Sequence, residues 1–396
     1  MSPLPRTRSI DSPDDPAPWA DADAAPRAPL DGDTTADVVV VGAGLTGLWS
    51  AYYLLEADPS LDVVLVESGV TGQDERGLGG CSARVGLDGD ALARRWGAPA
   101  AVEARAILRD AVVEVGGVAA VEQVDCGFAF GGEVLVAADD VALARLEREA
   151  AAAVRWGDET HVLDATGLRA HVQIDDALGG TWSPEAARVD PGRLARALLD
   201  VLVAHGARVV DRTPVARVSA AAAVTAHGTV RAATVIDTRP TAPPARGGAT
   251  IATAPLPAEV WAAIGLPRAE LVAHSDGLRL VRTASDRLVV GRARATGRRA
   301  ARVLGALLTP LGSSRTLHEA LVDLLPVLTD VPVTHAWLRP LAAPGSLPSI
   351  GLVDDRVWAR SGGTGPAAAN VAGRTVAELV TGTPSALTSA PWVQHG

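Results

Sequence analysis

The sequence predicts an α/β protein of two domains, with a parallel sheet in the domain that begins near the N-terminus. Three observations carry this prediction. Four consecutive valines, 38–41, lead into a glycine-rich turn; a helix-forming stretch and a second apolar strand follow at once; and the 396 residues exceed what one hydrophobic core normally supports. A strand, a helix and a strand in this order form a right-handed βαβ unit, whose strands run parallel.

The first elements can be placed residue by residue. Residues 1–36 are rich in Pro, Asp and Ala without a period, so we expect an extended surface arm. The first strand, 38–41, ends at the glycine turn. A helix at 45–56 and a second strand at 62–67, with the sequence DVVLVE, complete the unit.

The turn has the spacing G-x-G-x-x-G, and each glycine has a mechanical role. Gly42 permits the tight turn, Gly44 lets a pyrophosphate approach the backbone, and Gly47 lets the helix pack close to the strand. The helix N-terminus offers unpaired N–H groups and a partial positive charge to phosphates. About 20 residues further on, Glu67 stands where an acceptor for ribose hydroxyls belongs. These features predict dinucleotide binding, and the acid disfavours the 2′-phosphate of NADP, so FAD and NAD remain.

The later elements favour FAD. An NAD dehydrogenase would continue with regular βα units, whereas here the cofactor domain is assembled from separated segments, as is typical of flavoproteins. The expected elements are a second glycine-rich loop at 71–86, a helix at 190–205 with Gly206 just past its end, strands at 207–218, 222–228 and 229–237, a strand pair at 277–293, and a strand, a glycine-rich turn and a long helix at 356–382.

Composition excludes several classes of function. A net charge of −10 leaves no basic face for nucleic acid or anionic membrane. All 36 basic residues are arginine, so a Schiff-base aldolase, a pyridoxal-phosphate enzyme and a Walker-type phosphate loop, which need a lysine, are excluded. The expected partner is a small molecule.

The cysteine content and the hydropathy pattern bear on where in the cell the protein is expected to act. Cys81 and Cys126 are too few for a disulfide framework or a zinc site, and we expect both thiols to be buried and inert. No metal site is predicted. Because no charged-then-apolar leader is evident, the expected location is cytoplasmic. The uncharged run 38–55 is interrupted by the glycines and reads as strand, turn and helix, so no membrane span is expected.

Five motifs in chain order point to one family. They are PWADADAAPRAPLDGDTTADVVVVGAGLTGL at 18–48, GGTWSPEAARVDPGRLARALL at 179–199, RTPVARV at 212–218, HAWLRPLAAPGSLPSIG at 335–351 and SGGTGPAAANVAGRTVAELVTG at 361–382. Together they resemble the FAD-dependent amino-acid and amine oxidases, a family typified by D-amino acid oxidase, glycine oxidase and γ-glutamylputrescine oxidase. The resemblance covers nearly the whole chain.

The resemblance implies a fold in two parts. A Rossmann-like FAD-binding domain is assembled from the discontinuous segments 37–92, 188–240 and 342–396. A smaller α+β substrate domain with an antiparallel sheet comprises 93–187 and 241–341. No cysteine matches the position used elsewhere in the family for covalent flavin attachment, so the resemblance implies non-covalent FAD.

The resemblance also implies roles for individual positions. The FAD pyrophosphate would lie against the glycine turn, the adenosine ribose against Glu67, and the adenine against the backbone of Val215. The C-terminal helix would point its N-terminus at the pyrimidine edge of the isoalloxazine and stabilise negative charge there. The implied cofactor-binding residues are Gly42, Gly44, Leu45, Thr46, Gly47, Glu67, Ser68, Gly79, Gly80, Val215, Gly362, Gly363, Thr364 and Gly365.

Arg339, in the motif WLRP, matches the arginine that pairs with the substrate carboxylate in D-amino acid and glycine oxidases. A planar guanidinium can hold both carboxylate oxygens and fix the α-carbon over the flavin. The alternative is a surface arginine beside a proline. Trp337 and His335 on the same strand are expected to be wall residues.

Three features depart from the family pattern. Family members commonly carry SGRNGG where this chain has ERGLGG, so Leu78 replaces a polar residue near the flavin. Some relatives use a lysine near flavin N5 to activate dioxygen, and this chain has none. A dehydrogenase is therefore an alternative to an oxidase, and the expected electron acceptor is O2 or another molecule. The segment VIDTRP replaces a small, apolar strand end and sets Asp237 and Arg239 at the rim of the cofactor domain.

These observations predict an FAD-dependent oxidoreductase that oxidises the C–N bond of a small amino acid to an imine by hydride transfer. One alternative is an oxidase or dehydrogenase of an amine without an α-carboxylate, as in γ-glutamylputrescine. Another is a flavin-binding subunit with no independent catalysis, prompted by Leu78 and Asp237, and a nicotinamide dehydrogenase is the last competitor. The sequence leaves open the substrate, the acceptor and the oligomeric state.

Overall fold

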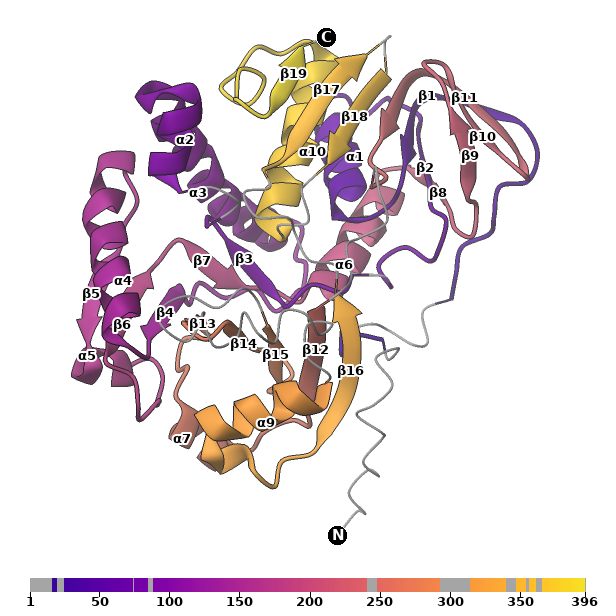
Figure 1. Ribbon diagram of the computed structural model, residues 1–396. Coiled ribbons are helices and arrows are strands. Elements are labelled where there is room, and N and C mark those ends of the chain that lie inside the picture. The colour runs from indigo at the N-terminus through magenta and orange to yellow at the C-terminus, as the bar shows by residue number, and fades with distance from the viewer. Residues whose placement is uncertain are drawn as a thin grey trace.

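The structure is a computed structural model and describes residues 16–19, 25–73, 75–84, 88–240, 248–292, 314–339, 347–353, 356–360 and 365–395. Two large sheets with helices packed on them dominate this part of the chain (Figure 1). The first sheet combines parallel and antiparallel strands, and the second is almost wholly antiparallel. The predicted α/β fold class is confirmed.

The first sheet is built around three parallel strands. Strand β1 (Thr34–Val41) lies between β2 (Val63–Val66) and β11 (Gly228–Asp237), and Val41 pairs with both Val66 and Asp237. The carboxyl ends of the three strands therefore meet at one edge. The sheet's order in the described residues is β19-β17-β18-β11-β1-β2-β8, and a hairpin of β9 and β10 extends from β11. The other strands are β8 (Arg208–Val210), β9 (Val215–Val218), β10 (Ala222–Thr225), β17 (Ser349–Val353), β18 (Arg356–Arg360) and β19 (Val393–His395).

Both faces of β1 are covered, which explains its unbroken run of valines. Val38 and Val40 belong to the buried cluster under the helices, whereas Val39 and Val41 pack with residues of the β9–β10 hairpin on the other face. Helix α1 packs closely on α10, where a Cβ on Gly373 would lie 2.4 Å from Trp49 Cβ. The helices of this half are α1 (Leu45–Ala57), α2 (Gly89–Trp96), α3 (Ala98–Val121), α6 (Pro191–Ala204) and α10 (Pro366–Thr381).

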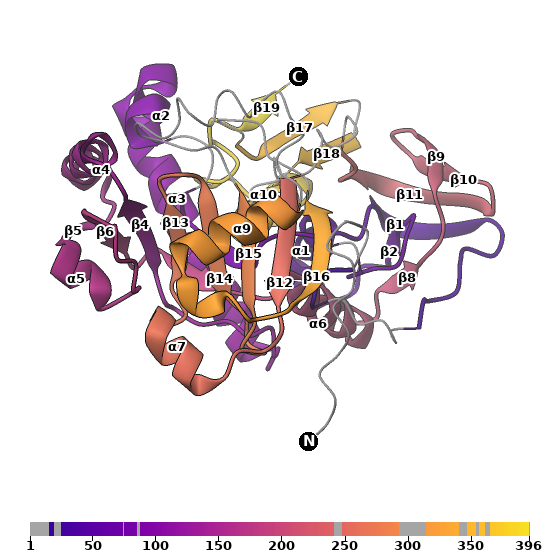
Figure 2. The same cartoon turned by 60° about the horizontal axis from the view of Figure 1, so that its bottom comes forward.

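The second sheet has the order β16-β12-β15-β14-β13-β4-β6-β5 in the described residues, and only β13 and β4 pair in parallel. Its strands are β4 (Glu133–Ala137), β5 (His161–Asp164), β6 (Gly179–Ser183), β12 (Gly248–Thr253), β13 (Leu271–His274), β14 (Leu278–Arg282), β15 (Leu288–Arg292) and β16 (Val333–Arg339). Helices α7 (Ala258–Ile264) and α9 (Ser314–Leu324) lie on the side of this sheet that faces away from the first one (Figures 1 and 2).

Short elements connect the two halves. Strands β3 (Gly80–Ser82) and β7 (Ala186–Arg188) form a two-stranded ribbon between the sheets (Figure 1). Helices α4 (Asp140–Ala153) and α5 (Ala165–Arg169) pack beside β5 and β6, and single turns of 3₁₀ helix occur at η1 (Val154–Trp156) and η3 (Pro326–Leu328).

Most predicted elements are confirmed with small shifts at their ends. The helix expected at 190–205 is α6, which starts with Pro191 at its first turn, and Gly206 follows it with φ +91°. The strand pair expected at 277–293 is β14 and β15. Both cysteines are buried and free, and burial raises the pKa of Cys126 to about 11 and that of Cys81 further still. None of the helices described here is long and apolar enough to cross a membrane.

Three segments differ from expectation. The single strand expected at 207–218 is two strands, of which β8 pairs with β2 and β9 pairs with β10. Within the expected surface arm, Ala17 and Trp19 are buried beside Trp337 of β16, and Thr34 to Ala36 belong to β1. Burial of a large indole against apolar side chains is favourable. The polar residues around Trp19 in the sequence gave no sign of that burial. Helix α3, expected in the substrate domain, shares the buried cluster of α1 and α10.

Candidate functional site

The glycine turn follows β1 as predicted. Gly42 has φ +99°, and its N–H donates to the carbonyl of Val66 at 2.9 Å. Gly44 is the N-terminal cap of α1. A Cβ on Gly47 would lie 2.0 Å from the carbonyl oxygen of Gly42, so only glycine allows α1 to start this close to the strand.

This contact makes a stability prediction. Gly47→Ala should lower the free energy of unfolding by about 1–3 kcal/mol or prevent folding, because the added methyl meets backbone and not a flexible side chain. Urea denaturation measures the effect. Gly117→Ala within α3 is the matched control, since nothing lies within 4 Å of its added Cβ, and it should stabilise by up to about 1 kcal/mol. Equal stability of the two variants would contradict the close approach at Gly47.

Glu67 lies immediately after β2, and its carboxylate faces the glycine turn. Oε2 accepts from the N–H of Ala43 at 2.8 Å, and Oε1 accepts from the N–H of Gly69 at 2.8 Å and from the hydroxyl of Ser68 at 2.9 Å. The backbone N–H of Glu67 donates to Val210 of β8. These bonds fix the carboxylate at the edge where the strand ends meet.

Two backbone groups with predicted cofactor roles already have partners. The N–H of Leu45, the first residue of α1, donates to Oε1 of Glu75 at 3.2 Å. The carbonyl of Val215 accepts from Nη1 of Arg239 at 3.0 Å. Thr46, the next residue of the helix, is buried, and its carbonyl accepts from the hydroxyl of Ser50.

Arg239 is fixed by a second contact. Its Nη2 and Nε lie 3.0 and 3.1 Å from the carboxylate oxygens of Asp237, the last residue of β11. The hydrogen bonds from Arg239 outweigh the desolvation of Asp237 and hold the pKa of that carboxyl below its usual value. Asp237 and Arg239, which the sequence left without a physical account, therefore form an ion pair at the carboxyl edge of the sheet.

The second part of the site is a cavity of about 780 Å³ between the two sheets. The sequence-predicted residues Gly80, Gly365 and Arg339 line it, as does Leu78. A Cβ on Gly365, the cap of α10, would lie 3.3 Å from the carbonyl oxygen of Gly80, and Gly365 has φ +93°. Gly79 has φ +96° and sits between Val189 and Trp19. The predicted residues Gly362, Gly363 and Thr364 lie outside the described residues.

Arg339, the last residue of β16, is largely buried against this cavity. Its Nη2 donates to the carbonyl of Arg292 at 2.8 Å, and among the described residues no group hydrogen-bonds its Nε. Burial, with a smaller contribution from the nearby Arg279, lowers its pKa to about 10. A buried guanidinium short of partners favours an anionic ligand.

The wall residues expected on β16 lie around this arginine. Trp337 is fully buried, and its Nε1 donates to the carbonyl of Arg76 at 3.2 Å. Leu78 packs partly against the cluster formed by Trp19 and Trp337. His335 Nδ1 lies 2.9 Å from the hydroxyl of Thr334. Trp337 is thus a packed wall residue, as expected.

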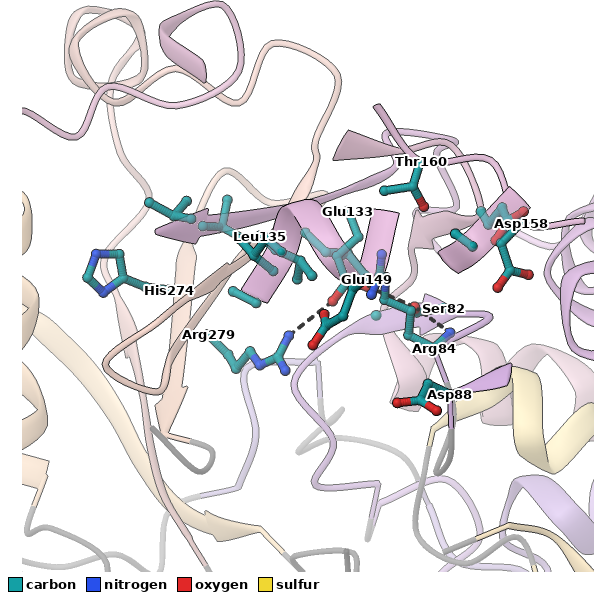
Figure 3. A pocket seen from close by; sticks show the side chains of 18 of the residues that line it. Ser82, Arg84, Asp88, Glu133, Leu135, Glu149, Asp158, Thr160, His274 and Arg279 are labelled. Atoms are coloured by element: carbon teal, nitrogen blue, oxygen red, sulfur yellow. Dashed lines mark hydrogen bonds and ion pairs between the residues drawn. The ribbon is translucent and has the colours of Figure 1, made fainter. Parts of the chain in front are cut away.

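A polar cluster in the cavity was not predicted from the sequence. Glu133, at the start of β4, is buried, and its Oε1 accepts from Arg279 at 3.0 Å while Oε2 accepts from the hydroxyl of Ser82 at 3.1 Å. Arg84 Nε is 3.6 Å from the same carboxylate. Figure 3 shows these side chains converging, with Glu149 of α4 beside them. They come from three distant parts of the chain, so no local signal could have grouped them.

These residues can be tested against FAD. Bare glycine backbone at the start of α1, an acid at the end of β2, and a cavity at the N-terminus of α10 fit a dinucleotide, whose redox ring Gly80 and Arg339 would hold. Glu75 and Arg239 contact Leu45 and Val215, the backbone positions predicted for the pyrophosphate and the adenine. The described residues contain no group of three or more His, Cys, Asp or Glu able to hold a metal ion.

Known proteins resemble this chain over most of its length. Residues 37–379 match the family model described as FAD dependent oxidoreductase. The γ-glutamylputrescine oxidoreductase of Escherichia coli (strain K12) is 27% identical over 389 residues, which cover 90% of this chain and 86% of that protein.

Solved structures show the same fold at lower identity. Glycine oxidase from Geobacillus kaustophilus has a TM-score of 0.70 at 19% identity, covering 91% of this chain and 98% of its own. L-Amino acid deaminase from Proteus myxofaciens, solved in complex with anthranilate, has a TM-score of 0.71 at 14% identity and covers 94% of this chain and 96% of its own. The match to the family model spans most of the sequence, and the chain belongs to the FAD dependent oxidoreductase family.

Proposed function

We propose that this protein oxidises the C–N bond of a small α-amino acid with non-covalently bound FAD, giving an imine that water hydrolyses. The observation that carries this proposal is Arg339, whose buried guanidinium faces the cavity with an Nε that no described group hydrogen-bonds. A substrate carboxylate would supply the missing acceptor and the negative charge.

The carboxylate anchor sets the geometry of the reaction. Arg339 is held from behind by its bond to the carbonyl of Arg292, so the guanidinium keeps a fixed direction. A carboxylate bound bidentately to it leaves the α-carbon and the amine with little freedom, which is the contribution of positioning to catalysis. Bound FAD supplies the acceptor for the hydride that leaves the α-carbon, while the nitrogen lone pair forms the C=N bond.

The chain's own residues supply the remaining functions. The N-terminus of α10, capped by Gly365, borders the cavity and carries a partial positive charge that favours negative charge nearby. Leu78 and Leu271 give the cavity an apolar wall beside Gly80, which limits water around the reacting carbon. The chain contains no lysine that could activate dioxygen. Reduced flavin is therefore reoxidised either by O2 without a lysine or by another oxidant.

One observation favours a second candidate. The relative at 27% identity is named a γ-glutamylputrescine oxidoreductase, which suggests as substrate an amine whose reacting carbon bears no carboxylate. In that case the cavity carboxylates, such as Glu149 and Glu133, would face the cationic parts of the substrate. The two candidates differ in what they require of Arg339.

An anaerobic screen tests the proposed chemistry. Protein supplied with excess FAD should lose the visible absorbance of bound flavin when small α-amino acids are added, because reduced flavin absorbs little in that range. The corresponding α-hydroxy acids, which carry a hydroxyl in place of the amino group, are the control. If no amino acid or amine bleaches the bound flavin, the chain is a flavin-binding subunit without independent catalysis.

A further inference from the structure

The adenosine end of the site already contains two charged side chains of this chain. Glu75 accepts the N–H of Leu45 at the start of α1, and Arg239 donates to the carbonyl of Val215. These are the backbone groups expected to meet the pyrophosphate and the adenine of FAD. The second glycine-rich loop thus brings a negative charge to the glycine turn, and the segment after β11 brings a positive charge to the start of β9.

Glu75 and a pyrophosphate would compete for one place. The first N–H groups of a helix and its partial positive charge attract anions, and a carboxylate satisfies them as a phosphate does. Glu75 Oε1 is 3.2 Å from the nitrogen of Leu45 and 3.6 Å from the position of a Cβ on Gly44. It therefore lies over the bare backbone that the second glycine leaves open, and two anions cannot share that backbone without strong repulsion.

The backbone of Glu75 is fixed from two sides. Trp19 Nε1 donates to the carbonyl of Glu75 at 2.7 Å, and Trp337 Nε1 donates to the next carbonyl, that of Arg76, at 3.2 Å. The two indoles meet edge to face with centroids 5.8 Å apart. Because both carbonyls are held, a phosphate can gain access by rotation of the Glu75 side chain, with the loop backbone staying in place.

Arg239 takes the place that the adenine is expected to occupy, at the carbonyl of Val215. Its guanidinium bridges Asp237, at the end of β11, and the carbonyl of Val215, at the start of β9. An adenine amino group would donate to the same carbonyl, so Arg239 supplies an N–H donor where the base would supply one. A carboxylate and a guanidinium thus satisfy the polar groups that the ADP half of FAD would satisfy.

We propose that Glu75 and Arg239 are internal competitors of the ADP half of FAD, so that the cofactor binds only by displacing them and is held as an exchangeable ligand. This inference rests on the proposed function only in taking FAD as the cofactor. Glu75 is the stronger of the two determinants, because the phosphate charge and the carboxylate charge repel each other.

Binding measurements on the full chain test the inference. Removing the negative charge with Glu75→Gln should tighten the dissociation constant for FAD about tenfold or more, measured by quenching of FAD fluorescence. The amide oxygen can still accept the Leu45 N–H, so the fold should be kept, and circular dichroism checks this. Glu56→Gln, on the exposed last turn of α1, makes the same charge change away from the turn and should leave FAD binding unchanged.

Riboflavin and ADP show which half of FAD is responsible for the change in affinity. Riboflavin lacks the ADP half, so its dissociation constant should be the same in wild type and in Glu75→Gln. ADP alone should bind more tightly to the variant by the same factor as FAD. A second variant, Arg239→Gln, removes the guanidinium from the Val215 carbonyl and should also tighten FAD binding, by a smaller factor.

Equal affinity of wild type and Glu75→Gln for FAD would overturn the inference, as would purification of the wild-type protein with one firmly held FAD per chain. An equal gain for riboflavin would also overturn it, since the effect would then not arise at the pyrophosphate. Failure of the proposed function has a different signature: flavin that binds but that no amine or amino acid bleaches, which leaves the comparison of dissociation constants intact.

Discussion

Replacing Arg339 with leucine should lower kcat/KM for an α-amino-acid substrate by about 30-fold to several thousandfold, mostly through a higher KM. The variant removes a buried charge that faces the cavity and leaves the substrate carboxylate without a partner, and loss of one member of such a pair costs about 2–5 kcal/mol. Steady-state kinetics across a series of amino acids, with saturating FAD, measures the effect.

Two variants sharpen this experiment. Arg339→Lys keeps the charge but loses the bidentate geometry, so it should recover only part of the lost affinity. Arg169→Leu, on the exposed surface of α5, makes the same substitution outside the cavity and should leave kcat/KM unchanged. If Arg339→Leu leaves the KM for the best substrate as it was, that substrate has no α-carboxylate, and the amine candidate replaces the amino-acid one.

Trp19→Ala should lower the free energy of unfolding by about 3–5 kcal/mol, the usual cost of removing a buried indole. Trp19 is 5% exposed and packs with Trp337, and a Cβ on Gly192 would lie only 2.6 Å from its ring. Its own carbonyl also accepts from Arg196 at 2.8 Å. A segment that sequence composition assigned to the surface therefore acts as part of the core. Urea denaturation followed by circular dichroism measures the change.

A milder substitution separates packing from hydrogen bonding. Trp19→Phe keeps most of the apolar ring but cannot donate to the carbonyl of Glu75, so it should cost about 1–2 kcal/mol. A surface residue would give less than about 0.5 kcal/mol for either substitution. Values in that range for both variants would contradict the burial of the N-terminal segment.

The nucleotide-binding framework could be predicted from the sequence because it depends on local rules. The spacing of Gly42, Gly44 and Gly47 between a valine run and an apolar helix has few other physical explanations, and the structure shows strand, turn and helix at those residues. Proline at the start of α6 and a left-handed glycine after its end likewise mark boundaries locally.

Residues that depend on tertiary contacts could not be found this way. Glu133, Arg279 and Ser82 meet only after β4, β14 and β3 are brought together. Glu75 lies in the glycine-rich loop 71–86, and its contact with Leu45 depends on how that loop folds. Arg239 was noticed as a departure from the family pattern, and only the structure gives it a partner, the carbonyl of Val215.

The pairing of β1 with β11 has a consequence for biosynthesis. One of the two partners of β1, strand β11, lies about two hundred residues later in the chain, and β18 and α10 of the same layer lie later still. Contacts this remote in sequence slow the search for the native state. During translation the valine strand therefore emerges with one edge unpaired and one face uncovered, and both stay exposed until β9, β10 and β11 have been made.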